Sequence, residues 1–484
     1  MSLGQIDHIV VLMLENRSFD SMLGKLYPKS ATFDGLDGTE QNPGSSGVPV
    51  QVWSSTGTDE NTMRIPDPDP GELWTDINTQ LFGMPNVGSP APIPTMDGFV
   101  KNYVNQPANA GQTFDPKNVM HYFTPKQVPV ISRLAKQFAV CDRWFASAPC
   151  QTWPNRWFVH AATADGYENN RPIHLPDVET IYNRFEQARI GDWKIYFHDI
   201  AQAHTLLKLF LLSNHFHFYR QFQADCQRGQ LPSYSFIEPQ YYSDMAHPEN
   251  DQHPPSVVTL GEQLIADVYN RLRSSKLWIK TLLIITYDEH GGCYDHVPPP
   301  SATQPETPRP DQVFKFDRYG VRVPAVIVSP YVKPGTIFRP PGTVPYDHTS
   351  IIATLRKRFS ALGGPLTRRD ETAPDLESAL TLATPDNKGP PRLKALPYAP
   401  TPAAAAIADV RPLNDNQKAL VGLAANLPEA PGVDLQAHLA TVKAQAKQHP
   451  PDTTLDVRTA SAYVRKQVGN FFREPTQMTP LAHH

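Results

Sequence analysis

The feature that most constrains the fold of this chain is a set of four short apolar runs, rich in β-branched and aromatic residues. They cover residues 9–14, 194–197, 282–286 and 325–329. Continuous runs of this length are typical of strands buried on both faces, as in a mostly parallel sheet covered by helices. The sequence therefore predicts an α/β fold. Helical periodicity over 256–275 and 350–359 indicates two of the covering helices.

The chain of 484 residues is long enough for one large α/β domain with an accessory region. After about residue 390 the composition changes to Ala, Pro and Leu, with helical patterns over 414–427 and 459–475. We therefore predict a catalytic domain over 1–385 and a mainly helical accessory region over 386–484. Residues 30–94 are rich in Gly, Pro, Asp and Ser and show little periodicity, which predicts a long ordered excursion or a partly mobile lid.

Charge and composition exclude several classes of protein. The formal net charge of −4, without a basic stripe, argues against a nucleic-acid partner. The four cysteines form no CxxC pair, which argues against a thiolate zinc site and leaves the redox compartment open. No export signal is visible and no apolar run approaches about 20 residues, so we expect a soluble chain, cytoplasmic as written or exported if a signal was trimmed. The oligomeric state stays open.

Polar residues follow two of the predicted strands directly. Glu15 and Asn16 come after the first run, and Asp288, Glu289 and His290 come after the third, followed by two glycines. Ligands of open α/β sheets bind beyond the carboxyl ends of the strands. Adjacent carboxylates repel unless a cation or a hydrogen-bond donor offsets their charge, so the pattern predicts a cation site. A helix N-cap after the first run and a solvated turn after the third are the alternatives.

A third cluster surrounds Thr152, which lies between Pro149 and Pro154 and is followed by Asn155 and Arg156. A hydroxyl becomes a good nucleophile only beside a base or a metal ion. An arginine can hold two phosphate oxygens, although an ordinary ion pair is the alternative for Arg156.

Histidines make up the fourth cluster: His253 in NDQHPPS and His348 in VPYDHTSI. An imidazole can protonate a leaving alkoxide near neutral pH, although single loop histidines are more often structural. Oxygen ligands, a hydroxyl, an arginine and several acids together favour phosphoryl or phosphodiester transfer, in which positioning and charge neutralisation dominate.

Seven ordered motifs resemble those of the phosphoesterase family that joins bacterial and plant non-specific phospholipases C with acid phosphatase A. The similarity extends over roughly residues 6–370. The motifs are ENRSFDSMLG, DRWFASAPCQTWPNRWFVHAAT, SFIEP, NDQHP, TYDEHGGCYDHVPPP, RVPAVIVSPY and YDHTSI.

This resemblance implies an alkaline-phosphatase-like three-layer α/β sandwich with one divalent metal ion. Position by position, it implies a Thr152 nucleophile and a phosphate pocket in which one histidine is the general acid. The implied metal ligands are Glu15, Asn16, Thr152, Asp288 and Glu289, and the implied substrate contacts are Asn155, Arg156, His253, His290 and His348. Oxygen ligands favour calcium, magnesium or manganese, and zinc also accepts carboxylates.

One segment departs from the family pattern. Members often have Gly-Pro before the nucleophile, where this chain has Cys150 and Gln151, although the spacing to Thr152 is retained. Cys150 is interpreted as a bystander and not as a second nucleophile.

The resemblance implies a phospholipase C that cleaves phosphatidylcholine-type diesters through a phosphothreonine intermediate. Its partners would be a phospholipid or small phosphoester and, transiently, a membrane surface. A broad-specificity acid phosphatase is the alternative activity. A non-catalytic binding protein is the third alternative. Such a protein would be expected to have lost the hydroxyl or a metal carboxylate, and this chain retains both.

Overall fold

The computed structural model describes residues 2–44, 47–243, 248–310, 312–398, 410–428, 433–445 and 455–472. Over these residues no helix combines the length and the apolar character that a membrane crossing requires.

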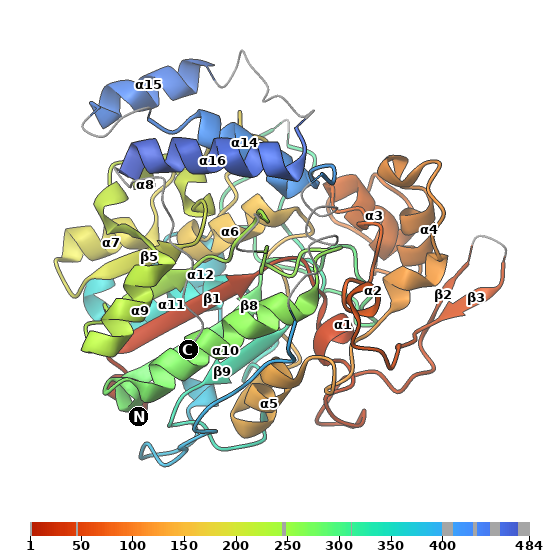
Figure 1. Cartoon of the computed structure of the whole chain (residues 1–484), viewed down its shortest axis with the longest axis horizontal. Helices are drawn as coiled ribbons and strands as arrows, with labels where there is room; N and C mark the ends of the chain where they lie inside the picture. Colours follow the sequence, from red (N-terminus) through yellow and green to blue (C-terminus); the bar gives the residue numbers. More distant parts are fainter. Residues whose placement is uncertain are drawn as a thin grey trace.

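An eight-stranded sheet forms the centre of the molecule (Figure 1), in the order β10–β4–β9–β8–β1–β7–β5–β6. Strand β9 runs antiparallel to β4 and β8, and the other pairings in this sheet are parallel. The strands are β1 (His8–Leu14), β4 (Ala139–Cys141), β5 (Trp193–Phe197), β6 (Phe216–Phe218), β7 (Tyr234–Ile237), β8 (Thr281–Tyr287), β9 (Ala325–Val328) and β10 (Thr336–Phe338).

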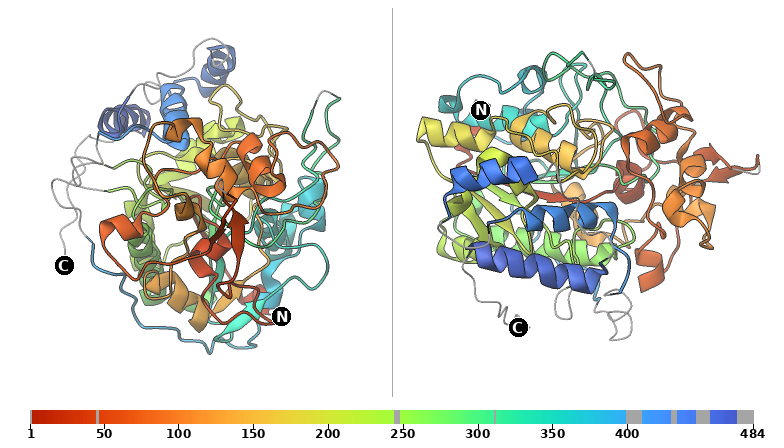
Figure 2. Two further views of the ribbon diagram at one scale, coloured as in Figure 1. Left: turned by 90° about the vertical axis from the view of Figure 1, so that its right-hand side faces the viewer. Right: turned by 90° about the horizontal axis from the view of Figure 1, so that it is seen from above.

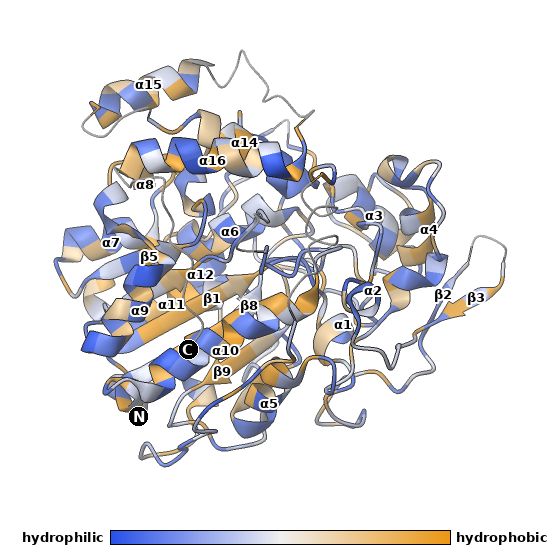
Figure 3. Ribbon diagram, in the orientation of Figure 1, coloured by the Kyte–Doolittle hydropathy of each residue, from blue (hydrophilic) through white to orange (hydrophobic). Residues whose placement is uncertain are grey.

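The predicted α/β class is confirmed, and the four predicted runs correspond to β1, β5, β8 and β9. Strand β8 is buried along its whole length, and Figure 3 shows β1, β8 and β9 in hydrophobic colours. The sequence analysis missed β4, β6, β7 and β10. These strands have only three or four residues, too few for a periodic pattern to be read.

Helices cover both faces of the sheet and complete three layers (Figure 1). One face carries α5 (Pro129–Gln137), α9 (Tyr219–Arg228) and α10 (Val258–Ser274), and α10 packs against the other two. The opposite face carries α6 (Thr152–Ala161), α7 (Ile181–Ala188), α11 (Thr349–Arg358) and α12 (Arg368–Thr372). Helices α10 and α11 confirm the helical patterns at 256–275 and 350–359.

The described part of the excursion at 30–94 is ordered and lies at one end of the sheet (Figure 2). A second hydrophobic core that includes Ile77, Phe99 and Tyr103 supports it. Its helices and strands are β2 (Gln41–Pro43), β3 (Pro49–Gln51), α2 (Glu60–Met63) and α3 (Trp74–Phe82). Helix α1 (Phe19–Leu23) precedes the excursion, and helix α4 (Phe99–Val104) follows it.

The C-terminal region contributes α14 (Asp415–Ala425), α15 (Leu435–Gln445) and α16 (Val457–Phe472). Helices α14 and α16 pack on each other, and α14 also contacts the 3₁₀ turn Gln202–Thr205. The predicted helices at 414–427 and 459–475 are thus present, although 473–475 lie outside the described residues. The remaining short helices are α8 (Leu207–Phe210) and the 3₁₀ turns Ser2–Gln5, Pro107–Asn109, Pro116–Met120, Ser213–His215, Trp278–Lys280, Ser360–Leu362 and Leu376–Ala379.

Candidate active site

The two predicted carboxylate clusters meet at one edge of the sheet. Strands β1 and β8 are parallel neighbours in which Leu14 pairs with Tyr287, so the residues that follow them emerge side by side. The backbone N–H of Asn16 donates to Oδ1 of Asp288 at 3.0 Å. The strand register therefore produces the convergence that the sequence pattern predicts.

The orientation of the Asn16 amide is fixed by its neighbours. Its Nδ2 donates to Glu72 Oε1 at 2.8 Å and to Glu289 Oε1 at 2.6 Å, so its oxygen faces the hydroxyl of Thr152. Asn16 adopts a φ of 55°, in the left-handed region, and Gly291 lies against it. A Cβ on Gly291 would come within 2.2 Å of the Asn16 carbonyl oxygen, so only glycine allows this approach.

Thr152 is the first residue of α6, and its side chain is buried in the polar cluster. Its Oγ1 lies 3.3 Å from Glu15 Oε2 and 3.3 Å from Asn16 Oδ1. The N-terminus of a helix favours negative charge, which suits an alkoxide or a phosphate at this position. The hydroxyl thus faces two of the oxygen atoms predicted to share a metal ion with it.

Asn155 holds the loop that precedes Thr152. Its Nδ2 donates to the carbonyl oxygens of Ala148, Cys150 and Gln151, and its Oδ1 accepts from the N–H of Ala148. These contacts point the side chain at the loop. Contact between Asn155 and substrate stays a prediction, and the observed bonds give it a positioning role.

Arg156 lies one turn further along α6, between two carboxylates. Its Nη2 donates to Glu15 Oε1 at 2.5 Å, and its Nε lies 3.5 Å from Asp288 Oδ2. Burial opposes the charge, but attraction to Glu15, Tyr241 and Asp288 outweighs it and raises the pKa of Arg156. Its Nε and Nη1 have no hydrogen-bond partner among the described residues and are available to an anion.

Two residues that the sequence analysis missed complete the surroundings of Glu15. Gln202 Nε2 donates to Glu15 Oε1 at 2.8 Å, and Asn416 Nδ2, from α14, donates to Oε2 at 3.2 Å. Burial, with the charge of Asp288 adding and Arg156 opposing, raises the pKa of Glu15 to about 8. No local sequence signal identifies either amide, because each reaches the site only through tertiary packing.

His348 is held by two fixed partners. Its Nε2 lies 2.6 Å from the carbonyl oxygen of Asp288, and the indole N–H of Trp144 donates to its Nδ1 at 3.3 Å. A carbonyl only accepts and an indole N–H only donates, so the ring carries its proton on Nε2 and is neutral. Burial lowers the pKa of His348, in keeping with this state. Its predicted catalytic and phosphate-binding roles stay predictions.

His290 is also committed on both sides. Gln80 donates from Nε2 to the carbonyl oxygen of Gly71, which directs its Oε1 to His290 Nε2 at 2.7 Å. The other nitrogen, Nδ1, lies 3.1 Å from Glu289 Oε2. Burial lowers the pKa of His290 to about 3 and, with the charge of Glu72 adding, raises the pKa of Glu289 well above its usual range. The predicted catalytic and substrate-binding roles of His290, and metal ligation by Glu289, stay predictions.

His253 differs from the other two histidines. It is fully buried, and its Nε2 lies 3.3 Å from Glu72 Oε1 outside hydrogen-bonding geometry. Burial would lower its pKa, but the charges of Glu72 and Asp69 outweigh burial and raise it well above the usual range. Of the three predicted histidines, His253 is the one with a ring nitrogen available to a ligand.

Comparison with known proteins assigns the chain to a family. Residues 6–362 match the model of the Phosphoesterase family. The chain belongs to this family. It is 38% identical to non-specific phospholipase C3 of Arabidopsis thaliana over 82% of this chain and 78% of that protein. It is also 27% identical to phospholipase C B of Mycobacterium tuberculosis over 82% of this chain and 83% of that protein. The predicted family and the prediction of a phosphoric ester hydrolase are confirmed.

Among solved structures, an alkaline phosphatase superfamily protein from Vibrio parahaemolyticus is similar at a TM-score of 0.29 and 13% identity, over 50% of this chain and 65% of that one. The lipoteichoic acid synthase LtaP from Listeria monocytogenes gives a TM-score of 0.29 and 10% identity, over 54% of this chain and 69% of that one.

Buried polar atoms without partners support an ion at the phosphoesterase site. Within the described structure, Asp288 Oδ2, Gln202 Oε1 and Asn416 Oδ1 lack hydrogen-bond partners although all three residues are buried. Buried oxygen atoms are rarely left unpaired, and a divalent cation beside Thr152 would satisfy Asp288 Oδ2. Glu15 Oε2, Asn16 Oδ1, Thr152 Oγ1 and Asp288 Oδ2 fit such an ion, and Glu289, whose oxygens accept hydrogen bonds from Asn16 and Gly291, stays a predicted ligand.

A separate group of possible metal ligands consists of Asp20, Asp295 and His296. Arg322 donates to Asp295 Oδ1 and to Asp20 Oδ1, each at 2.9 Å. His296 lies with Nδ1 2.6 Å from Asp20 Oδ2 and Nε2 3.1 Å from Asp34 Oδ1. The guanidinium and the imidazole already supply the positive charge, so this cluster is interpreted as structural.

The charge of His296 predicts a pH-dependent stability. Burial would lower its pKa, but hydrogen bonds to Asp20 and Asp34 outweigh burial and raise it from 6.5 to about 9. A raised folded-state pKa adds stability that is complete below pH 6.5 and is lost as the pH rises through about 9, here about 3 kcal/mol. We expect urea unfolding to show this loss in the wild type and a smaller one in His296→Gln. Equal losses in both proteins would contradict the assignment.

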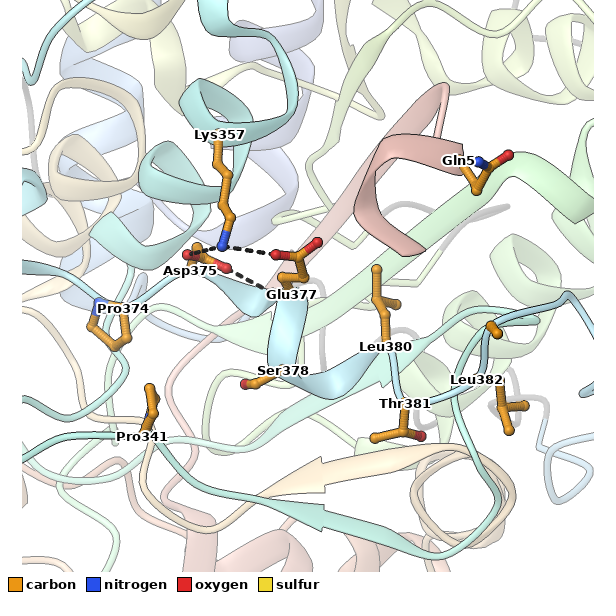
Figure 4. Close-up of a pocket in the computed structure, with 11 residues that line it drawn as sticks. Gln5, Pro341, Lys357, Pro374, Asp375, Glu377, Ser378, Leu380, Thr381 and Leu382 are labelled. Carbon is orange, nitrogen blue, oxygen red and sulfur yellow. Dashed lines mark hydrogen bonds and ion pairs between the residues drawn. The ribbon is translucent and has the colours of Figure 1, made fainter. Parts of the chain in front are cut away.

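A pocket of about 620 Å³ lies away from this chemistry (Figure 4). Gln5, one of its lining residues, precedes the start of β1, whereas the site follows the end of that strand. Lys357 in the pocket is paired with Asp375 at 2.8 Å and Glu377 at 2.9 Å. Its charge is already neutralised, so the pocket offers no site for a phosphate.

Proposed function

We propose that this chain is a metal-dependent phospholipase C that hydrolyses phosphatidylcholine-type phosphodiesters to diacylglycerol and the phosphorylated head group. The observation that carries the proposal is the buried Thr152 hydroxyl, which faces Glu15 and Asn16 and lies on the same helix as Arg156. The names of the plant and mycobacterial relatives support the choice of a phospholipid diester.

A divalent ion would be held by Glu15, Asn16, Thr152 and Asp288. When bound, it would lower the pKa of the Thr152 hydroxyl and neutralise charge on the phosphate. The protein contributes the geometry: Glu15 Oε2 accepts a hydrogen bond from the Thr152 hydroxyl, and the proton lost on attack therefore has an acceptor at this atom. The buried Nη1 of Arg156 has no hydrogen-bond partner among the described residues and would donate to a phosphate oxygen.

The reaction then proceeds in two balanced steps. Thr152 Oγ1 forms a bond to phosphorus while the bond from phosphorus to the diacylglycerol oxygen breaks, and that oxygen gains a proton. Water next attacks phosphorus, which releases the phosphorylated head group and restores the hydroxyl. The rings of His290 and His348 already hydrogen-bond to protein groups, whereas His253 Nε2 has no hydrogen-bond partner among the described residues. We therefore place the departing oxygen on the side of the site where His253 Nε2 lies.

The test compares a chromogenic phosphocholine diester with the matching phosphate monoester, with and without a chelator. We expect diester turnover to dominate and to fall by roughly a hundredfold or more once the ion is removed, because the hydroxyl loses its activation. Added Mn²⁺, Mg²⁺, Ca²⁺ or Zn²⁺ should restore it. Dominant monoester turnover at acid pH would replace the proposal by an acid phosphatase. Full activity after verified metal removal would exclude the metal-dependent mechanism.

A further inference from the structure

A second cluster of possible cation ligands lies directly beside the first. Asp69 and Glu72 come from the segment between α2 and α3, and His253 comes from the segment between β7 and α10. One ligand atom from each of the three lies within 4.8 Å of the others. The cluster contacts the Thr152 site through Asn16, whose Nδ2 donates to Glu72 Oε1 while its Oδ1 faces the hydroxyl.

The tautomer of His253 is set by its own loop. Nδ1 lies 2.7 Å from the carbonyl oxygen of Pro254, and a carbonyl can only accept, so Nδ1 carries a proton. The opposite nitrogen, Nε2, is fully buried and has no hydrogen-bond partner in the described part of the chain. Histidines that bind metals commonly donate their other N–H to a backbone carbonyl in this way, which fixes the ring and directs the lone pair at the ion.

The surrounding carboxylates favour a positive charge at this position, which a bound cation or a second proton on the His253 ring would supply. Nε2 faces Glu72 Oε1 at 3.3 Å, and if Nε2 is unprotonated the two lone pairs at this distance repel unless a positive charge lies between or beside them. Asp69 Oδ1 also lacks a hydrogen-bond partner among the described residues, and it lies 3.7 Å from Nδ1 of His253. Arg17, a guanidinium near these loops, donates to the backbone carbonyls of Ile65, Gln252 and Ser256.

We infer that Asp69, Glu72 and His253 bind a second divalent cation, separated from the ion proposed at Thr152 by the Asn16 side chain. Two carboxylates and one imidazole suit Zn²⁺ or Mn²⁺ better than Mg²⁺ or Ca²⁺. Three protein ligands leave a coordination position open, as in catalytic sites, and that position can take a substrate oxygen. Only this last role rests on the proposed function; the binding site itself does not.

The experiment measures metal bound per chain in the absence of substrate. The 484-residue chain and its variants are stripped with chelator and titrated with Mn²⁺ or Zn²⁺ alone, and bound ions are counted by calorimetry and elemental analysis. We expect two ions in the wild type and one in Asp69→Asn or Glu72→Gln.

Asp288→Asn removes a proposed ligand of the Thr152 ion and should also leave one ion, which is then bound at the second cluster. Asp288→Asn combined with Asp69→Asn should therefore leave none. Asp67→Asn is the matched control, because Asp67 is exposed on the same segment and outside the cluster.

Asp69→Asn is the variant best suited to remain folded, since this side chain is 28% exposed, and circular dichroism would confirm folding. One ion in the wild type, or two in folded Asp69→Asn and Glu72→Gln, would overturn the inference and leave His253 as a protonated imidazole. Two ions without diester hydrolysis would support the second site and reject the proposed activity. One ion with diester hydrolysis would reject the second site and support the proposed activity.

Discussion

Replacing Thr152 by alanine is expected to lower diester turnover by roughly a thousandfold or more, because the substitution removes the nucleophile and one of the oxygen atoms that would bind the ion. Thr152→Ser retains a hydroxyl at the same place and should keep turnover within about tenfold of the wild type. Initial rates at saturating substrate measure both effects. Rapid acid quenching and intact-protein mass spectrometry should reveal the head-group phosphate on the wild type and not on Thr152→Ala.

Cys150→Ala is the matched control for this experiment. The Cys150 thiol lies two residues before Thr152 and is completely buried, and burial raises its pKa well above the usual range. A thiol in that state is a poor nucleophile, so the variant should retain its activity and the covalent adduct. If Cys150→Ala lost the adduct while Thr152→Ala kept it, the nucleophile would be Cys150 and not Thr152.

The sequence predicted the site residues that directly follow the ends of strands β1 and β8. Runs of six and five apolar residues identified β1 and β8, and their parallel pairing placed Glu15 and Asn16 beside Asp288. This inference succeeds because the carboxyl ends of adjacent parallel strands share one edge of a sheet. It requires no knowledge of how the remaining chain packs.

Contacts made through loops and distant helices could not be predicted in this way. Asn416 reaches Glu15 across 401 residues of sequence, and Gln202 does so from a 3₁₀ turn with no periodic pattern. Glu72 lies in a proline-rich stretch that also contains Asp67 and Asp69, where a single acidic residue resembles any solvated one. The structure shows it to be buried against Asn16, which no local signal reveals.

The histidines illustrate the same limit at the level of single atoms. Residue type suggested a proton donor at three positions, but the proton of a neutral imidazole is directed by whatever lies beside each nitrogen. For His348 that neighbour is the backbone carbonyl of Asp288, and for His290 it is the amide of Gln80. Both partners are supplied by tertiary packing, so the sequence could list the candidates without ranking them.

At pH 9, where Glu15 is ionised, Arg156→Met is expected to lower the free energy of unfolding of the metal-free protein by about 3–5 kcal/mol, because it leaves two buried carboxylates without their positive partner. Glu15 and Asp288 are both completely buried, and Arg156 Nη2 also donates to the carbonyl oxygens of Met13 and Leu14 at the end of β1. Urea unfolding in the presence of chelator measures the loss. Diester turnover should fall as well, since the proposed phosphate clamp is removed.

Two comparisons separate charge from shape at this position. Arg156→Lys keeps the positive charge without the planar fork, so it should retain more of the stability than Arg156→Met while losing most of the turnover. If a divalent ion binds among Glu15, Asn16, Thr152 and Asp288, added Mn²⁺ should stabilise Arg156→Met more than the wild type, because the ion then supplies the only positive charge between these carboxylates. Equal stabilisation of the two proteins, or an Arg156→Met variant as stable as the wild type in chelator, would show that Glu15 and Asp288 do not carry the charges assigned to them.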